Sequence, residues 1–363
     1  METKNERKVP FLATHPGRIL QNELGERGIS QKDFAQMIGM RTSHLNEIIK
    51  GKRSITIAIA DKLEEALGIP SISWVNLQTQ YDYDCKIIDK RKVEEIEACN
   101  EMEDYDKAFD VKTILKRLGI AVDASASILL KKMKSILSLP EPAELQLSFG
   151  MFKKSQKTGL DSRMIATWIL LARYESRNTE IKGRYEKEKT RELAENLKKI
   201  FNENENVVPR LKEMFSLYGI RFNVVEKVDY ASIDAYSFIE NGIPAICVTK
   251  RYDRIDNLAF DVMHELGHVC LHLDENKSSI ASVENYDGES IEEKEANRYA
   301  ANMLIPESLW STAPRVRMNP FVIQRDYTAW AKKNNMNKWI VLGRISKETG
   351  MYKFRSDNSR KIN

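Results

Sequence analysis

The sequence predicts a mainly α-helical protein of several domains: an all-α N-terminal bundle, a helical middle region and a C-terminal α+β domain with a small sheet. Residues 15–82 alternate short helical patterns with glycines, residues 85–200 are rich in Lys and Glu at helical spacing, and strand patterns begin after residue 207. The middle region carries no cluster of chemically active residues and is expected to be a connector. The expected domains are residues 1–84, 85–206 and 207–363.

Composition excludes several classes of protein. The chain has 363 residues, of which 42% are hydrophobic and 30% charged, and its apolar runs are too short to span a membrane. The N-terminal segment lacks the apolar core of a signal peptide. The four cysteines show no C-x-x-C spacing, which argues against a disulfide framework and a cysteine zinc knuckle. We therefore expect a cytoplasmic protein with no membrane partner.

The first domain has the spacing of a helix-turn-helix within a bundle of about five helices. Ser30 can cap a support helix that contains Ala35, and Gly39 marks the turn after it. A recognition helix is expected from Thr42 to Lys50. This arrangement predicts that one short helix is presented to the major groove of DNA.

Local clustering of charge, rather than net charge, supports a DNA interface. The formal net charge is only +4, and basic and acidic residues are equally numerous in residues 1–84. The side chains expected near base edges are Arg41, Thr42, Ser43, His44, Asn46 and Glu47, and those expected at phosphates are Lys50, Lys52 and Arg53. The acids Glu47, Glu64 and Glu65 leave open a helical module that binds protein instead of DNA.

From residue 207 onward the pattern predicts a helix, three strands and paired helices. The segment VVPRLKEMFSLYG indicates a helix, IRFNVVEKV a strand, and residues 231–250 two strands joined by the turn Glu240-Asn241-Gly242. One helix is expected from about Asn257 and a second from Ile291 to Leu304. Two short helices around an Asn-rich turn are expected in the C-terminal part.

Three of the five histidines lie in the segment FDVMHELGHVCLHL. His264 and His268 are four residues apart, so on a helix they would project from one face and could bind one ion. Glu265 is rotated by about 100° from His264 and would reach a water at that ion without ligating it. Such a glutamate is the base that a hydrolase needs, and a zinc ion with an open position suits this reaction. We expect a zinc site with Glu265 as the catalytic base.

The third metal ligand is expected on the helix that follows Ser290. Ser290 and Glu293 have the spacing of a capping box, which would occupy Glu293 at the helix start. Glu292 and Glu295 remain, and helical periodicity does not separate them. We favour Glu295, because it lies inside the regular helix, where small neighbours would let two helices approach closely.

The other notable residues of the histidine segment are not expected to bind the metal. His272 lies another four residues beyond His268 and could close the site as a fourth ligand, but a place beside the ligands or at the surface is preferred. Cys270 is expected to be a thiol outside the site. Gly267 in the middle of a helix indicates close packing, because glycine there costs about 1 kcal/mol relative to alanine.

The segments HELGH and EEKEANRYAANMLIP resemble the ImmA/IrrE family of zinc metallopeptidases, and the resemblance covers residues 207–345. It implies a minimal gluzincin-like domain, with Glu295 as third ligand, that cleaves repressor proteins in stress responses or mobile elements. Residues 15–83 are similar to HigA-type antitoxins of the Xre helix-turn-helix superfamily through HPGRILQNEL, NEIIKGKRSIT and SWVNLQTQYD. That resemblance implies binding of a DNA operator as a homodimer, and a toxin partner in a toxin–antitoxin setting.

Two functions of different classes remain open. In the first, the chain is a DNA-binding regulator and zinc endopeptidase that cleaves a helix-turn-helix repressor or an antitoxin, or its own linker around residues 85–110, to switch on stress, mobile-element or defence genes. In the second, it is a non-enzymatic HigA-like antitoxin or repressor whose metal domain binds a toxin or senses a ligand. We favour the first, because Glu265 stands beside two candidate histidine ligands.

Overall fold

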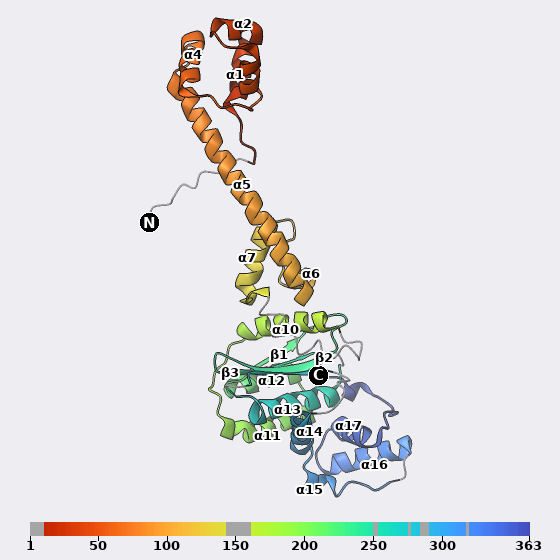
Figure 1. Ribbon diagram of the computed structural model, residues 1–363. Helices are drawn as coiled ribbons and strands as arrows, with labels where there is room; N and C mark the ends of the chain where they lie inside the picture. The colour runs from red at the N-terminus through yellow and green to blue at the C-terminus, as the bar shows by residue number, and fades with distance from the viewer. Residues whose placement is uncertain (1–10, 143–160, 250–252, 275–276, 284–289, 317–318) are drawn as a thin grey trace. The chain divides into compact units, whose positions relative to one another are not determined.

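The computed structural model describes residues 11–142, 161–249, 253–274, 277–283, 290–316 and 319–363 (Figure 1). The chain divides into two compact units, which consist of residues 1–100 with 125–127 and of residues 101–124 with 128–363. The described residues are mainly helical and form one four-stranded sheet in the second unit. This architecture confirms the predicted fold class.

The first unit is a helical bundle around one apolar core. Its first four helices are α1 (Pro16–Glu26), α2 (Gln31–Met37), α3 (Thr42–Ile49) and α4 (Ile57–Leu67). Leu20, Phe34, Leu45 and Trp74 are fully or almost fully buried in this core. Gly17 sits where α1 meets the end of α3, because a Cβ atom there would lie only 1.9 Å from the backbone oxygen of Ile48.

Helix α5 (Ser71–Ala108) differs from the sequence prediction. It is continuous through the boundary expected between residues 84 and 85, so the chain has no break there. The reason is local: residues 71–108 contain neither glycine nor proline, and nothing in that stretch ends a helix. The change in composition near residue 85 therefore falls inside a helix, and the first compact unit extends beyond it to residue 100.

The second boundary, expected between residues 206 and 207, also differs from the packing. The helices before it are α6 (Val111–Arg117), α7 (Ala126–Leu137), α10 (Ser162–Arg177) and α11 (Thr190–Glu203). Leu197 and Phe201 of α11 belong to the same core as Phe222 and Val262 from beyond the boundary. At least α11 is thus part of the C-terminal unit rather than a connector.

The sheet contains β1 (Arg221–Val225), β2 (Ile233–Glu240), β3 (Ile243–Thr249) and β4 (Ser279–Val283) in the order β1-β3-β2-β4. β1 is parallel to β3, and β2 is antiparallel to both β3 and β4. Asn241 and Gly242 have φ of 54° and 75°, so they form the two-residue turn with positive φ that hairpins favour. The predicted hairpin is confirmed, whereas β4 was not predicted.

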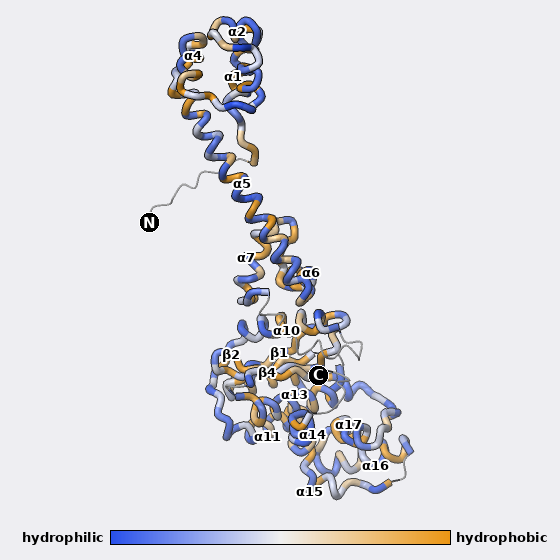
Figure 2. The backbone as a smooth tube through the Cα atoms, viewed as in Figure 1, coloured by the Kyte–Doolittle hydropathy of each residue, from blue (hydrophilic) through white to orange (hydrophobic). Residues whose placement is uncertain are grey.

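Helices cover both faces of the sheet (Figure 1). On one face, Cys247 of β3 contacts the backbone oxygen of Ala172 in α10. On the other, Ser237 of β2 contacts α13 (Ile255–Leu271) through Glu265. The strands are accordingly apolar along much of their length, as expected for a sheet buried on both faces (Figure 2).

The remaining helices complete the C-terminal unit. They are α12 (Val207–Leu217), α14 (Ile291–Leu304), α15 (Glu307–Trp310), α16 (Pro320–Lys333) and α17 (Lys338–Thr349), with short 3-10 helices at Lys187–Lys189 and Asn358–Arg360. The helices expected near Asn257 and from Ile291 to Leu304 are confirmed. Among the described residues, no helix combines the length and the apolar character that a membrane crossing requires.

Candidate metal centre and nucleic-acid surface

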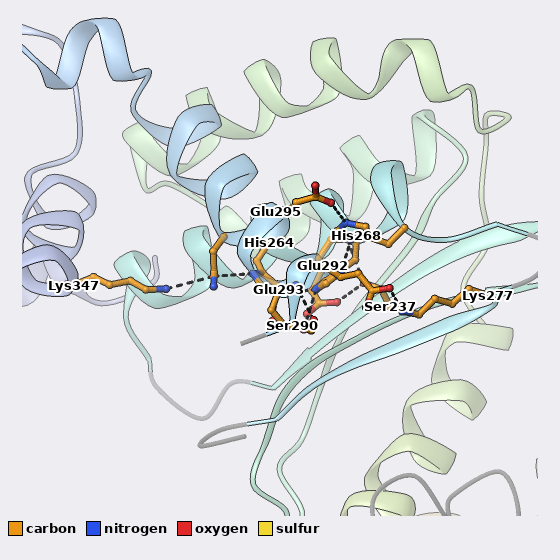
Figure 3. Close-up of polar contacts among 12 residues, drawn as sticks. Ser237, His264, His268, Lys277, Ser290, Glu292, Glu293, Glu295 and Lys347 are labelled. Carbon is orange, nitrogen blue, oxygen red and sulfur yellow. Dashed lines mark hydrogen bonds and ion pairs between the residues drawn. The ribbon is translucent and has the colours of Figure 1, made fainter. Parts of the chain in front are cut away.

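Helix α13 brings two imidazole rings together as its spacing predicts. His264 and His268 lie one turn apart, and their Nε2 atoms are 2.9 Å from each other. His264 is 6% exposed and His268 is completely buried. Two ring nitrogens that lie this close together in a buried place form a potential metal-binding pair (Figure 3).

Helix α14 packs closely against α13 at Gly267. A Cβ atom on Gly267 would lie 3.1 Å from the ring of Tyr299 and 3.3 Å from the Cα atom of Ala296. Ala296 and Ala300 of α14 are completely buried in this contact. The small residues therefore let the two helices approach, as expected, and place the first turn of α14 beside the histidines.

The carboxylate that reaches the histidines is that of Glu293. Its oxygens lie 3.2 Å from Nε2 of His264 and 3.4 Å from Nε2 of His268, and the three ligand atoms form one compact group. The pKa of Glu293 is lowered: burial alone would raise it, but hydrogen bonds from the two imidazoles outweigh that effect. Glu293 is therefore held in the charged form that binds metals.

The preference for Glu295 as third ligand is corrected by this geometry. Ser290 caps α14 by accepting a hydrogen bond from the backbone N–H of Glu293 at 3.1 Å, as the capping box requires. The side chain of Glu293, however, turns to the histidines instead of returning to the cap. Glu295 lies 3.1 Å from Nε2 of His272, and Glu292 pairs with Lys277 at 2.6 Å.

The outer nitrogen of His264 contacts Asn297, which the sequence analysis did not identify. The His264 Nδ1 atom lies 3.1 Å from Oδ1 of Asn297, and Nζ of Lys347 lies 3.4 Å from the same oxygen (Figure 3). Since an amide oxygen only accepts, His264 donates from Nδ1 in this contact, and Nε2 is the nitrogen that faces Glu293 and His268. The spacing Glu293 to Asn297, one helical turn, is the signal that could have indicated this pair.

Glu265 lies on the sheet side of α13 and is completely buried. The hydroxyl of Ser237 in β2 donates a hydrogen bond to its carboxylate. The pKa of His264 is raised: burial alone would lower it, but the bond to Glu293 and the charge of Glu265 act more strongly in the opposite direction. Glu265 is thus electrostatically close to the histidines without joining the group of ligand atoms.

The two minor candidates of the histidine segment lie outside that group. The ring of His272 faces the outer nitrogen of His268, with 2.9 Å between the two Nδ1 atoms, and does not point to the Nε2 side. The thiol of Cys270 donates to the backbone oxygen of Gly267 at 3.4 Å, and burial raises its pKa. Neither side chain joins the three ligand atoms.

A cavity of about 520 Å³ lies next to the site, between α13, α14 and α17. Asn297 lies in its wall and also contacts His264, so the cavity is one residue away from the ligand group. Phe260, Leu304 and Ile340 give it an apolar lining. Charged residues of both signs also line it, and one of them is Lys347, whose Nζ atom stands 4.2 Å from the ring centre of Phe260.

The helix-turn-helix segment presents most of its predicted contact residues to solvent. The exposed ones are Arg41, Thr42, Ser43, Lys50, Lys52 and Arg53, whereas His44, Asn46 and Glu47 are half-buried. Gly39 makes the turn between α2 and α3 with φ of 60°. Arg53 pairs with Glu47 at 3.0 Å, but a surface pair of this kind contributes about 1 kcal/mol or less.

Comparisons with known proteins match the two regions of the chain that contain these residues. A family model described as helix-turn-helix matches residues 20–73, and the peptidase M78 model, described as IrrE N-terminal-like domain, matches residues 224–327. Virulence-associated protein I of Dichelobacter nodosus is 37% identical over 82 residues, which make up 22% of this chain and 76% of that protein.

Two further similar proteins match a comparable length. The uncharacterized HTH-type transcriptional regulator YddM of Escherichia coli (strain K12) is 32% identical over 72 residues, or 19% of this chain and 77% of its own. Among solved structures, an addiction module antidote protein of a HigA family from Coxiella burnetii is 33% identical. It covers 24% of this chain and 95% of its own, with a TM-score of 0.22.

Proposed function

Since the chain belongs to the helix-turn-helix proteins through residues 20–73 and to the IrrE N-terminal-like peptidase family through residues 224–327, we propose that it is a DNA-binding regulator with zinc-dependent endopeptidase activity. Its substrate is a repressor or an antitoxin that itself carries a helix-turn-helix. One observation supports this most strongly: His264, His268 and Glu293 converge while Glu265 stands beside them.

The three ligand atoms fit a zinc ion. Zinc bonds of about 2.0–2.1 Å in a tetrahedron place neighbouring ligand atoms about 3.3 Å apart. The two Nε2 atoms are 2.9 Å apart, and the carboxylate of Glu293 approaches Nε2 of His264 to 3.2 Å with one oxygen and Nε2 of His268 to 3.4 Å with the other, which is close to that value. Two nitrogens and one carboxylate leave a fourth position open, which is the arrangement of catalytic rather than structural zinc sites.

In the proposed peptide hydrolysis, a bound zinc ion and the side chains of the protein would have different roles. A zinc ion in this place supplies the Lewis acidity that polarises a peptide carbonyl and acidifies water. The carboxylate of Glu265 takes the proton from the attacking water and passes it to the nitrogen of the leaving amine. Ser237 supports this role, because the hydrogen bond that its hydroxyl donates holds the carboxylate of Glu265 in place.

The neighbouring cavity receives a side chain of the substrate. The apolar part of its lining, Phe260, Leu304 and Ile340, suits an aliphatic or aromatic residue, which would lie near the candidate metal site because Asn297 borders the cavity and contacts His264. Lys347 stands at the same place and would meet a polar backbone group of the peptide.

The N-terminal domain brings the peptidase to its substrate. Exposed Lys50, Lys52 and Arg53 at the end of α3 provide phosphate contacts, and the start of α3 provides base contacts. We assign operator binding to a homodimer, since paired half-sites match paired recognition helices. A repressor bound at the same operator would then be held close to Glu265 and cleaved there.

A cleavage assay tests this function. The purified chain is loaded with zinc and incubated with the helix-turn-helix protein encoded beside its gene, and the products are analysed by mass spectrometry. We expect cleavage by the wild type and none by Glu265→Gln, with equal zinc content in both. A wild type that binds zinc and operator DNA but cleaves nothing, and that neutralises a neighbouring toxin, would instead support the non-enzymatic antitoxin.

A further inference from the structure

The third histidine of α13 and the glutamate that was expected to be a ligand form a chain of contacts behind His268. Nδ1 of His268 lies 2.9 Å from Nδ1 of His272, and Nε2 of His272 lies 3.1 Å from a carboxylate oxygen of Glu295. The side chain of His272 is only 7% exposed, whereas that of Glu295 is 43% exposed. This series of contacts therefore connects the fully buried ring of His268 with the carboxylate of Glu295 at the surface.

Only one arrangement of protons satisfies every contact while His268 binds a metal through Nε2. The lone pair of Nε2 must be free, so the proton of His268 is on Nδ1 and is donated to Nδ1 of His272. A neutral His272 that accepts on Nδ1 carries its own proton on Nε2, where it is donated to Glu295. The carboxylate, which only accepts when ionised, thus determines the tautomer of both rings.

Because His268 is buried, it depends on the contacts with His272 and Glu295 more than an exposed histidine would. His268 is completely buried, so its Nδ1–H must find a partner within the protein. Metal-binding histidines usually donate their outer N–H to an oxygen, and Asn297 plays that part for His264. For His268 the direct partner is a second imidazole, which needs Glu295 to hold it in the accepting tautomer.

We propose that His272 and Glu295 are positioning residues that act through His268 and tune its affinity for the metal. This inference rests on the proposed zinc site of His264, His268 and Glu293. It places His272 one contact and Glu295 two contacts away from the ligand His268, although the sequence analysis considered both residues as ligands.

Zinc affinity, measured by competition with a chromophoric chelator, tests the inference without any substrate. His272→Phe keeps a ring in the buried space but offers no acceptor, and we expect a 10- to 100-fold weaker Kd for zinc. His272→Asn places an amide oxygen near the position of Nδ1 and should recover most of that loss. Glu295→Gln should weaken binding by up to about tenfold. The visible absorption of the cobalt(II) form should shift in His272→Phe and return toward that of the wild type in His272→Asn.

A double variant of His272 and Glu295, together with a matched control, shows whether Glu295 acts through His272 or through its charge alone. Because Glu295 acts only through His272, Glu295→Gln should add less than twofold to the loss in His272→Phe. Glu292→Gln removes an equally exposed carboxylate from the same helix turn, which pairs with Lys277, and should leave zinc affinity within twofold of the wild type.

Three outcomes would overturn the inference. The first is a His272→Phe affinity within twofold of the wild type, with circular dichroism showing a folded chain. The second is an undiminished effect of Glu295→Gln in the His272→Phe background, which would mean that the carboxylate acts on the ion directly. The third is a wild type that binds zinc no better than His264→Ala, which would reject the metal site itself and is distinguishable from failure of the relay alone.

Discussion

Replacement of Glu293 distinguishes the observed carboxylate from the one that the sequence favoured. Glu293→Gln removes the charge whose oxygens lie 3.2 and 3.4 Å from the two Nε2 atoms, and Glu295→Gln changes a group that reaches only His272. Loss of an outer partner of a ligand costs about 10- to 100-fold in metal affinity. Loss of a ligand should exceed that range, so we expect Kd for zinc to rise by more than about 100-fold, or about 2.7 kcal/mol, in Glu293→Gln.

The assay combines chelator competition with thermal unfolding. A ligand at 100 times its Kd stabilises the folded state by about 2.7 kcal/mol, and Glu293→Gln should lose most of this gain at the same zinc concentration. Unfolding in excess EDTA is the control, since both variants should then resemble the wild type. The reasoning is refuted if Glu293→Gln binds zinc within tenfold of the wild type while Glu295→Gln loses more than 100-fold.

Three further predictions concern helix packing, DNA binding and the cavity. Gly267→Leu should destabilise the chain by about 1–3 kcal/mol and weaken zinc binding, because it pushes α14 away, whereas Gly25→Ala, with open space around it, should be neutral or stabilising in denaturant titrations. Lys50→Ala with Lys52→Ala should weaken binding to the DNA upstream of the gene and lower the salt dependence of log K by about 2, measured by fluorescence anisotropy; an unchanged slope would reject phosphate contacts. Ala301→Phe should fill the cavity and raise KM for cleavage while zinc affinity stays constant; equal kinetics would exclude the cavity from substrate binding.

The histidine pair and the hairpin could be predicted because each depends on local geometry. A separation of four residues places His264 and His268 on one helix face whatever the rest of the fold does. Asn241 and Gly242 tolerate the positive φ that a two-residue hairpin turn needs. Such features require no knowledge of how distant segments pack.

The carboxylate that faces His264 and His268 could not be predicted, because its position depends on the rotation of one helix against another. Glu292, Glu293 and Glu295 lie within one turn of α14, and periodicity alone does not say which of them faces α13. The contact of Gly267 with Ala296 sets that rotation and directs Glu293 to the histidines. The capping signature was correct for the backbone of Glu293 and misleading for its side chain.

The two compact units divide the chain at other positions than the expected domains, for a similar reason. Composition changes near residue 85, but the absence of glycine and proline lets α5 continue through that point. The amphipathic pattern of α11 is the same for a free connector and for a helix that packs on a core, and only Leu197 and Phe201 in contact with the C-terminal core decide between them. Strand β4 is short and rich in serine, so its sequence carries little strand signal, and its pairing with β2 is what defines it.

The central claim is that Glu265 acts as the base of a peptidase whose metal is held by His264, His268 and Glu293. The most direct measurement is the mass spectrum of the helix-turn-helix protein encoded beside the gene, after incubation with zinc-loaded wild type or Glu265→Gln. We predict a defined cleavage product with the wild type and only intact protein with Glu265→Gln, at equal zinc content. Equal cleavage by the two proteins would contradict the claim.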